Sequence, residues 1–276
     1  AGVYLLSFSF ASVVLSGIYL GAFSSGWPLV YLPMLSIMLY DFAYLGRAYT
    51  VKAAMLYASG FFLVHYGLRM PFRVRLKIGL VIATAIGFVV FMGAFTGRSK
   101  TEEVFISSKW LVPLVHWLNR LSGPLMGLNE VMLHPIPFLL GQESFRPVVK
   151  WLHEMGLFDN YVETAYLRLG IDPLFGFGES YRTFTYLRSF YDDFGLLGIV
   201  LGPYLMGLLC SLLFARSSLI SLTTLTFLYG AILYSFGDWL FWNPYYVLAL
   251  LNANIIAILV DRKSLLAIAH GHSKFG

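Results

Sequence analysis

Long apolar runs, separated by short polar segments, dominate the chain. A run of about 20 apolar residues is long enough for a helix to cross the hydrocarbon core of a bilayer, which is roughly 30 Å thick. Backbone polar groups in lipid must pair with one another, and a helix achieves this within one segment. The pattern therefore predicts an all-α polytopic membrane protein with seven transmembrane helices, at residues 3–23, 28–45, 50–67, 78–95, 195–215, 219–241 and 245–260. The second and third runs give the weakest signal, because Asp41 and Lys52 lie within them.

Basic residues between the runs set the expected orientation. Four of them fall within residues 69–77, Arg216 follows the fifth run, and Arg262 and Lys263 follow the seventh. Short loops rich in Lys and Arg stay in the cytoplasm. With seven spans, the basic loop 69–77, the loop at Arg216 and the segment after residue 260 all lie on the cytoplasmic side. The expected organisation is four spans in residues 1–97, a periplasmic segment over 98–194, three spans in 195–263 and a cytoplasmic tail over 264–276. Because the chain begins inside an apolar run and without Met, we expect further spans upstream.

Composition and charge narrow the class of protein. The chain is 58% apolar and 12% charged, whereas a soluble domain carries about 25% charged residues, so the composition argues against a soluble enzyme. Residues 98–194 hold nine basic and eleven acidic residues, a balance of −2, while the rest of the chain holds ten and three, a balance of +7. The net charge of +5 thus follows membrane topology and does not indicate a nucleic-acid partner. A single cysteine, Cys210, excludes a disulfide framework.

The segment 98–194 is predicted to be ordered rather than a flexible linker. Residues 109–132 are apolar with spaced polar residues and are broken by Pro113 and by Ser122-Gly123-Pro124. Residues 148–158 repeat this amphipathic pattern. Such segments are typical of short helices that lie in the membrane surface or dip back into the protein. We therefore expect a large ordered periplasmic loop with short amphipathic helices.

Motifs for cofactors and metals are absent from the sequence. It has no phosphate-binding glycine-rich loop, no dinucleotide fingerprint, no HExxH and no Cys/His cluster. The adjacent carboxylates Asp192 and Asp193 would point about 100° apart on a helix, which is poor geometry for one shared ion. The sequence therefore predicts no cofactor and no metal site.

The densest group of polar and aromatic residues comes just before the fifth run, in YRTFTYLRSFYDDFGLLG at residues 181–198. One interpretation is an aromatic belt at the membrane surface, with arginines that extend toward the headgroups. A belt, however, has no need for the carboxylates of Asp192 and Asp193, and Gly195 and Gly198 at the start of the fifth run indicate a tight entry of the helix near a polar cavity. Both interpretations stay open from the residues alone.

This segment resembles the signature of the O-antigen polymerases, which polymerise oligosaccharide repeat units for bacterial surface polysaccharides. Thr185, Arg188, the run Asp193-Phe194-Gly195 and Gly198 match that signature, whereas Arg182 stands where the family usually has Asn. The resemblance continues upstream in residues 121–125 and in residues 138–157, which include Gly141 and Phe145. Arg47 and Arg98 follow the ends of two predicted spans, as external arginines do in family members.

The resemblance implies a metal-independent glycosyltransferase of the bacterial inner membrane whose active site faces the periplasm. A growing glycan would leave its undecaprenyl diphosphate carrier and join a hydroxyl of the next lipid-linked repeat unit. Implied partners are the lipid-linked oligosaccharide, membrane lipid, a chain-length regulator and a flippase. The implied catalytic residues are Asp193 as base with Asp192 second, and Arg188, Arg47 and Arg98 on the diphosphate. The implied substrate-binding residues are Arg182, Tyr181, Thr185, Tyr186, Tyr191 and Glu179.

Three other classes compete with the polymerase. An O-antigen ligase, which transfers glycan to lipid A-core, tends to carry His beside Asn in the corresponding loop, and no His precedes Gly195 there. A transporter of lipid-linked sugars places charges near the midplane and shows internal repeats, whereas charges here gather in residues 98–194. A structural membrane subunit would leave the signature unexplained. For Arg47 the alternative to function is an ion pair with Asp41, or a misplacement of the two weakest spans.

Overall fold

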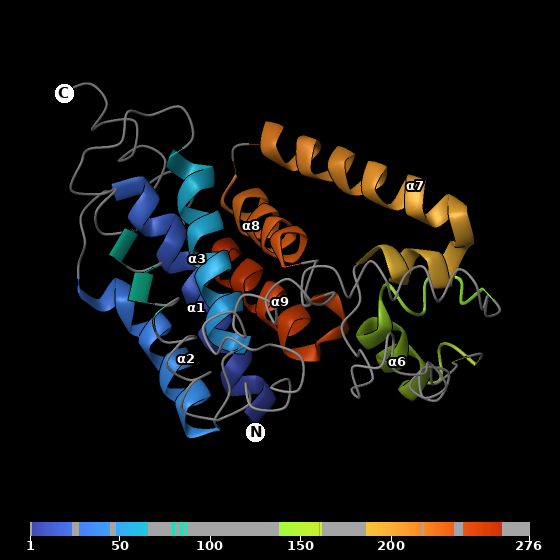
Figure 1. The fold of residues 1–276 in the computed structure, drawn as a ribbon, viewed down its shortest axis with the longest axis horizontal. Helices are drawn as coiled ribbons and strands as arrows, with labels where there is room; N and C mark the ends of the chain where they lie inside the picture. Colours follow the sequence, from blue (N-terminus) through green and yellow to red (C-terminus); the bar gives the residue numbers. More distant parts are fainter. Residues whose placement is uncertain are drawn as a thin grey trace, which may run out of the picture. The chain divides into compact units, whose positions relative to one another are not determined.

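The computed structural model describes residues 2–23, 28–44, 48–65, 138–159, 161, 186–216, 218–234 and 240–260, together with positions 79–80, 83–84 and 87. Within these ranges every regular element is a helix, so the predicted all-α class is confirmed for the described part of the chain. The named elements are α1 (Gly2–Phe23), η1 (Pro28–Tyr31), α2 (Leu32–Ala43), α3 (Ala48–His65), α6 (Arg146–Glu154), α7 (Tyr186–Ala215), α8 (Leu219–Leu233), η4 (Leu240–Trp242) and α9 (Pro244–Leu259) (Figure 1).

The chain divides into two compact units. The first unit comprises residues 1–96, 209–230 and 245–276, and the second comprises residues 97–208 and 231–244. The first therefore contains α1, α2, α3, α9 and most of α8, and the second contains α6, η4 and the greater part of α7.

Glycines bring α1 and α3 together in the first unit. A Cβ at Gly17 would collide with the Tyr57 carbonyl oxygen, and one at Gly21 would lie 2.8 Å from the Phe61 carbonyl oxygen. Gly17 and Gly21 are four residues apart and share one helix face, so their missing side chains let the two backbones approach closely, as in membrane helix pairs. The contacts follow the same order along both helices, which makes α1 and α3 parallel.

The buried carboxylate of Asp41 explains why a charge interrupts the second apolar run. Asp41 lies in the last turn of α2, and its Oδ2 accepts the backbone N–H of Thr50, in the first turn of α3, at 2.7 Å. The first N–H groups of a helix have no partner inside it, and the helix dipole favours a negative charge there. Asp41 therefore joins the end of α2 to the start of α3. Arg47, the ion-pair partner considered above, lies outside the described residues.

Polar side chains connect α8 with α9. Thr223 donates to the Asn254 side-chain oxygen at 2.6 Å, and Asn254 in turn donates to Thr224 at 3.1 Å. Closer to the other end of the pair, the Tyr246 hydroxyl donates to the Phe227 carbonyl oxygen at 2.6 Å. Hydrogen bonds of this kind between apolar helices contribute about 1 kcal/mol each and fix the register of the pair.

Two helices in the described ranges are long and apolar enough to cross a membrane, at Tyr4–Phe23 and Leu187–Ala215, and three shorter apolar helices occupy Pro28–Ala43, Leu219–Leu233 and Pro244–Leu259. The prediction of a helix over residues 219–241 is wrong at its C-terminal end, because α8 stops at Leu233. The sequence that follows includes Gly237 and Asp238, which have low helix propensity. The predicted span at residues 78–95 lies largely outside the described residues.

Candidate functional site

A sharp bend at Gly195 divides α7 in two, where the sequence predicted that a helix would begin. Gly195 has φ 62° and ψ −148°, a conformation open to glycine and essentially closed to residues with a Cβ. We call residues 186–194 the arm and residues 196–215 the shaft, and the ribbon of α7 shows the turn between them (Figure 1). The helix therefore starts nine residues earlier than predicted, at Tyr186.

Two further glycines let the arm fold back against the shaft. A Cβ at Gly198 would collide with the Phe190 carbonyl oxygen, and a Cβ at Gly202 would lie 2.6 Å from the Phe190 ring. Phe190 is buried as a result. Gly195 and Gly198, which belong to the signature discussed above, thus have a structural reason to be glycine, and Gly202 extends the same pattern by one turn.

The bend leaves the last carbonyl groups of the arm without the N–H partners that a continuing helix would supply. An adjoining segment, residues 138–145, provides them, and we call it the anchor loop. Leu139 N–H donates to the Asp192 carbonyl oxygen at 3.0 Å, and Leu140 N–H donates to the Asp193 carbonyl oxygen at 3.2 Å. The anchor loop therefore completes the end of the arm.

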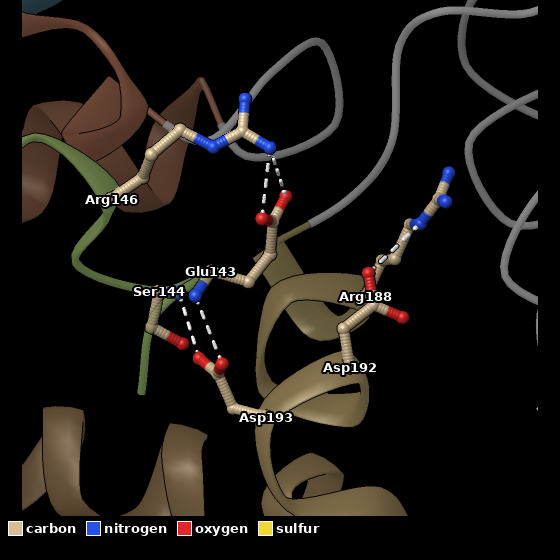
Figure 2. A network of polar contacts seen from close by, with 6 residues as sticks. All are labelled: Glu143, Ser144, Arg146, Arg188, Asp192 and Asp193. Atoms are coloured by element: carbon tan, nitrogen blue, oxygen red, sulfur yellow. Dashed lines mark hydrogen bonds and ion pairs between the residues drawn. The ribbon is translucent and has the colours of Figure 1, made fainter. Parts of the chain in front are cut away.

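The side chain of Asp193 also binds the anchor loop, in addition to its backbone carbonyl group. Its two oxygens accept the backbone N–H groups of Glu143 at 2.9 Å and Ser144 at 2.7 Å (Figure 2). Positive φ values at Leu140 (49°) and Gly141 (92°) reverse the loop, and successive N–H groups in such a turn form an anion-binding concavity. Burial raises the pKa of the Asp193 carboxyl, and the hydrogen bonds that it accepts lower it.

Two ion pairs flank this contact. Arg146, the first residue of α6, donates from Nη2 to both carboxylate oxygens of Glu143, at 3.2 and 2.9 Å, and Arg188 donates from Nε to Asp192 at 3.3 Å (Figure 2). Arg188 and Asp192 are almost completely buried, whereas about a quarter of the Arg146 side chain is exposed. Burial lowers the pKa of the Arg188 guanidinium, the Asp192 carboxylate raises it, and the charge of Arg146 lowers it further. Each cation is thus stabilised by its own carboxylate.

The structure brings together Arg188, Asp192 and Asp193, three of the five predicted catalytic residues, on successive turns of the arm. Tyr191 lies on the same arm and is half-buried, and Tyr186 is its first residue. The other predicted residues lie outside the described ranges, namely Arg47, Arg98, Glu179, Tyr181, Arg182 and Thr185.

Sequence reasoning missed Glu143, Ser144 and Arg146, although it singled out Gly141 and Phe145 beside them. The signal was the spacing of Glu143 and Arg146, since oppositely charged residues three apart pair at the start of a helix. Among the described residues, no group of three or more His, Cys, Asp or Glu side chains is arranged to hold a metal ion.

No protein-family model matches the chain, and searches of curated proteins and of solved structures return no match.

Proposed function

We propose that the protein is a polytopic inner-membrane glycosyltransferase with seven spans, which polymerises polyprenyl-diphosphate-linked oligosaccharide repeat units on the periplasmic face. The observation that carries this proposal is the group of two arginines and three carboxylates at the head of an apolar helix. Such a group suits a reaction in which a lipid-bound anion leaves at the membrane surface. The resemblance of residues 185–198 to the O-antigen polymerases supports the same activity.

The membrane location is supported by the shaft. Its 20 residues extend about 30 Å as a helix, which matches the hydrocarbon thickness. Only 17% of the most apolar stretch of α7 is buried. Leu197, Leu201 and Leu205 on the shaft are exposed. Hydrocarbon is the solvent in which such a surface is stable.

The leaving diphosphate carries the charge that the site has to stabilise. A guanidinium group binds phosphate oxygens through two parallel hydrogen bonds and does so without a metal. Arg188 is the central candidate, and the partly exposed Arg146 is a second one that the fold adds. Arg47, Arg98 and Arg182 complete the proposed set, and Tyr181, Tyr186 and Tyr191 would stack on sugar rings with Thr185 and Glu179 in the same subsite.

The acceptor hydroxyl has to lose its proton as its oxygen attacks. A bond forms between that oxygen and the anomeric carbon, the bond from this carbon to the diphosphate oxygen breaks, and the diphosphate leaves with the electron pair. A carboxylate takes the proton. Asp193, the aspartate that matches the signature, is the first candidate, and Asp192 is the second.

The test uses the full chain in vesicles with its cognate lipid-linked repeat unit, in EDTA, and measures the polymer ladder per amount of folded protein. Losing one charge-assisted contact in a water-poor site costs about 10²–10³ in rate, so Arg188→Ala should fall by that factor. Arg188→Lys should fall less, because lysine keeps the charge but loses the planar geometry.

Arg216, at the other end of the shaft, gives a matched control, since Arg216→Ala should leave the ladder unchanged. Wild-type ladders from Arg188→Ala would contradict the proposal. A ladder that needs added Mg²⁺ would contradict its metal independence. Transfer of the glycan to lipid A-core, with no ladder, would favour the ligase.

A further inference from the structure

The helix α6 and its flanking residues carry an apolar stripe that is largely exposed. Phe145, Val148, Leu152 and Met155 follow one another at intervals of three or four residues and therefore share one face. Phe145, Val148 and Met155 are 51%, 38% and 63% exposed, although such side chains gain about 1.5–3 kcal/mol from full burial. An apolar face of this kind requires an apolar partner.

The opposite face of the same helix is charged. Arg146, Lys150 and Glu154 follow one another at intervals of four residues. Lys150 and Glu154 form a weak exposed ion pair at 3.9 Å, and Arg146 is paired with Glu143. A short helix with one apolar and one charged face is typical of segments that lie in the plane of a membrane surface.

The connection of α6 to α7 fixes where that face lies. The helix follows directly on the anchor loop, and four hydrogen bonds hold this loop to Asp192 and Asp193, next to the bend at Gly195. If the shaft crosses the hydrocarbon core, the bend marks the point where α7 leaves it. The start of α6 is thereby held at the depth of the lipid headgroups.

Further exposed apolar side chains surround the bend. Phe138 lies within 3 Å of the position that a Cβ of Gly195 would take, the Phe194 ring lies close to Gly141, and Leu140 donates its N–H to the Asp193 carbonyl oxygen. All three are well exposed. Exposed apolar side chains thus occur on the shaft, at the bend and on α6.

We propose that α6 lies in the membrane–water interface, with the stripe Phe145, Val148, Leu152 and Met155 on the acyl chains of a phospholipid leaflet. Arg146, Lys150 and Glu154 then face headgroups and water. This inference rests on the membrane insertion of α7 proposed above. It assigns α6 and the anchor loop the role of holding the ion pairs Arg146–Glu143 and Arg188–Asp192 at the depth at which a lipid-linked diphosphate would lie.

The test places one spin label at a time on the full chain in phosphatidylcholine vesicles, in a Cys210→Ser background. The labelled variants are Val148→Cys and Leu152→Cys on the stripe, Lys150→Cys and Glu154→Cys on the charged face, and Leu197→Cys and Leu201→Cys on the shaft. Collision rates are measured with oxygen, which concentrates in lipid, and with a water-soluble nickel chelate. The expected result is preference for oxygen at the stripe and shaft positions and preference for nickel at 150 and 154.

The shaft positions separate the two proposals. If they prefer nickel, α7 does not cross the bilayer and both proposals fall. If they prefer oxygen while 148 and 152 prefer nickel, only the interfacial placement of α6 falls. Low collision rates with both reagents at 148 and 152 would show that protein covers the stripe, which also overturns the inference.

Discussion

Among the described residues, α1 and α7 are the two helices long and apolar enough to cross a membrane, and they differ in what surrounds them. In α1, 56% of the most apolar stretch of the helix is buried. Gly17 and Gly21 bring α1 against the backbone of α3. In α7 only 17% of the corresponding stretch is buried, and no atom of the described residues lies within 4 Å of the position of a Cβ at Gly207, on the shaft. Within the described part of the chain, α1 thus packs closely against a second helix, whereas most apolar side chains of the shaft are exposed.

The comparison also shows two ways to hold a helix in place. The α1–α3 contact is close-packed and depends on shape, so it tolerates little change in volume. The arm of α7 depends on glycines for the bend but on backbone N–H groups and the Asp193 carboxylate for its attachment to the anchor loop. Three substitutions, in order of decreasing expected effect, test whether this difference holds.

The largest effect is expected from deleting a buried ring in α1. Phe10 is completely buried against Tyr245 and Tyr49, and a buried Phe→Ala change costs about 3–5 kcal/mol. Phe10→Ala should lower the free energy of unfolding by that amount in detergent. Leu201→Ala on the shaft, which deletes an exposed side chain, should stay within about 0.5 kcal/mol. Equal losses in the two variants would remove the distinction between the helices.

An intermediate effect is expected from filling the glycine contact. Gly17→Leu places side-chain atoms where the Tyr57 carbonyl lies, and overpacking of this kind costs about 1–3 kcal/mol. Gly207→Leu is the matched control on the shaft, because the space around it is open. Thermal unfolding measured in the same detergent should show a lower midpoint for Gly17→Leu alone. A lower midpoint for Gly207→Leu would mean that the shaft packs against protein.

The smallest effect on stability is expected at the attachment of the arm. Asp193→Asn replaces one acceptor with an NH₂ group that faces a backbone N–H, and a hydrogen bond to a charged group contributes about 1.5–3 kcal/mol. We expect a loss near the lower end of that range, faster proteolysis within residues 138–145, and loss of chain growth if Asp193 is the base. Asp192→Asn, which breaks the pair with Arg188 but leaves the loop, should not speed that proteolysis. Unchanged proteolysis in Asp193→Asn would show that the carboxylate does not hold the loop.

Much of the helical framework could be predicted from the sequence, because apolar runs in lipid have few alternatives to a helix. The predicted run at residues 3–23 matches α1 within one residue, and those at 50–67 and 245–260 match α3 and α9 within two. The bend in α7 could not be predicted, since glycine is compatible with both a helix start and a reversal. Hydrophobic periodicity reports which face is apolar and carries no information on φ at one position.

Only some residues of the candidate site could be predicted from the sequence. Arg188, Asp192 and Asp193 lie within six consecutive residues, so their proximity follows from the local helix. Their neighbours Glu143 and Ser144 lie 50 and 49 positions away from Asp193 along the chain. The bonds to them are made by backbone N–H groups, which every residue other than proline has. No pattern of residue types could therefore have identified these two donors.

The bend at Gly195 has a consequence for how such a sequence is compared with others. Gly195, Gly198 and Gly202 account for the reversal without reference to any substrate, whereas Asp193 both holds the anchor loop and is the proposed base. Natural selection for the shape alone would retain the three glycines in proteins with different activities. Arg188 is not among them, so a search for functional relatives should give more weight to an arginine five residues before the aspartate than to the glycines that follow it.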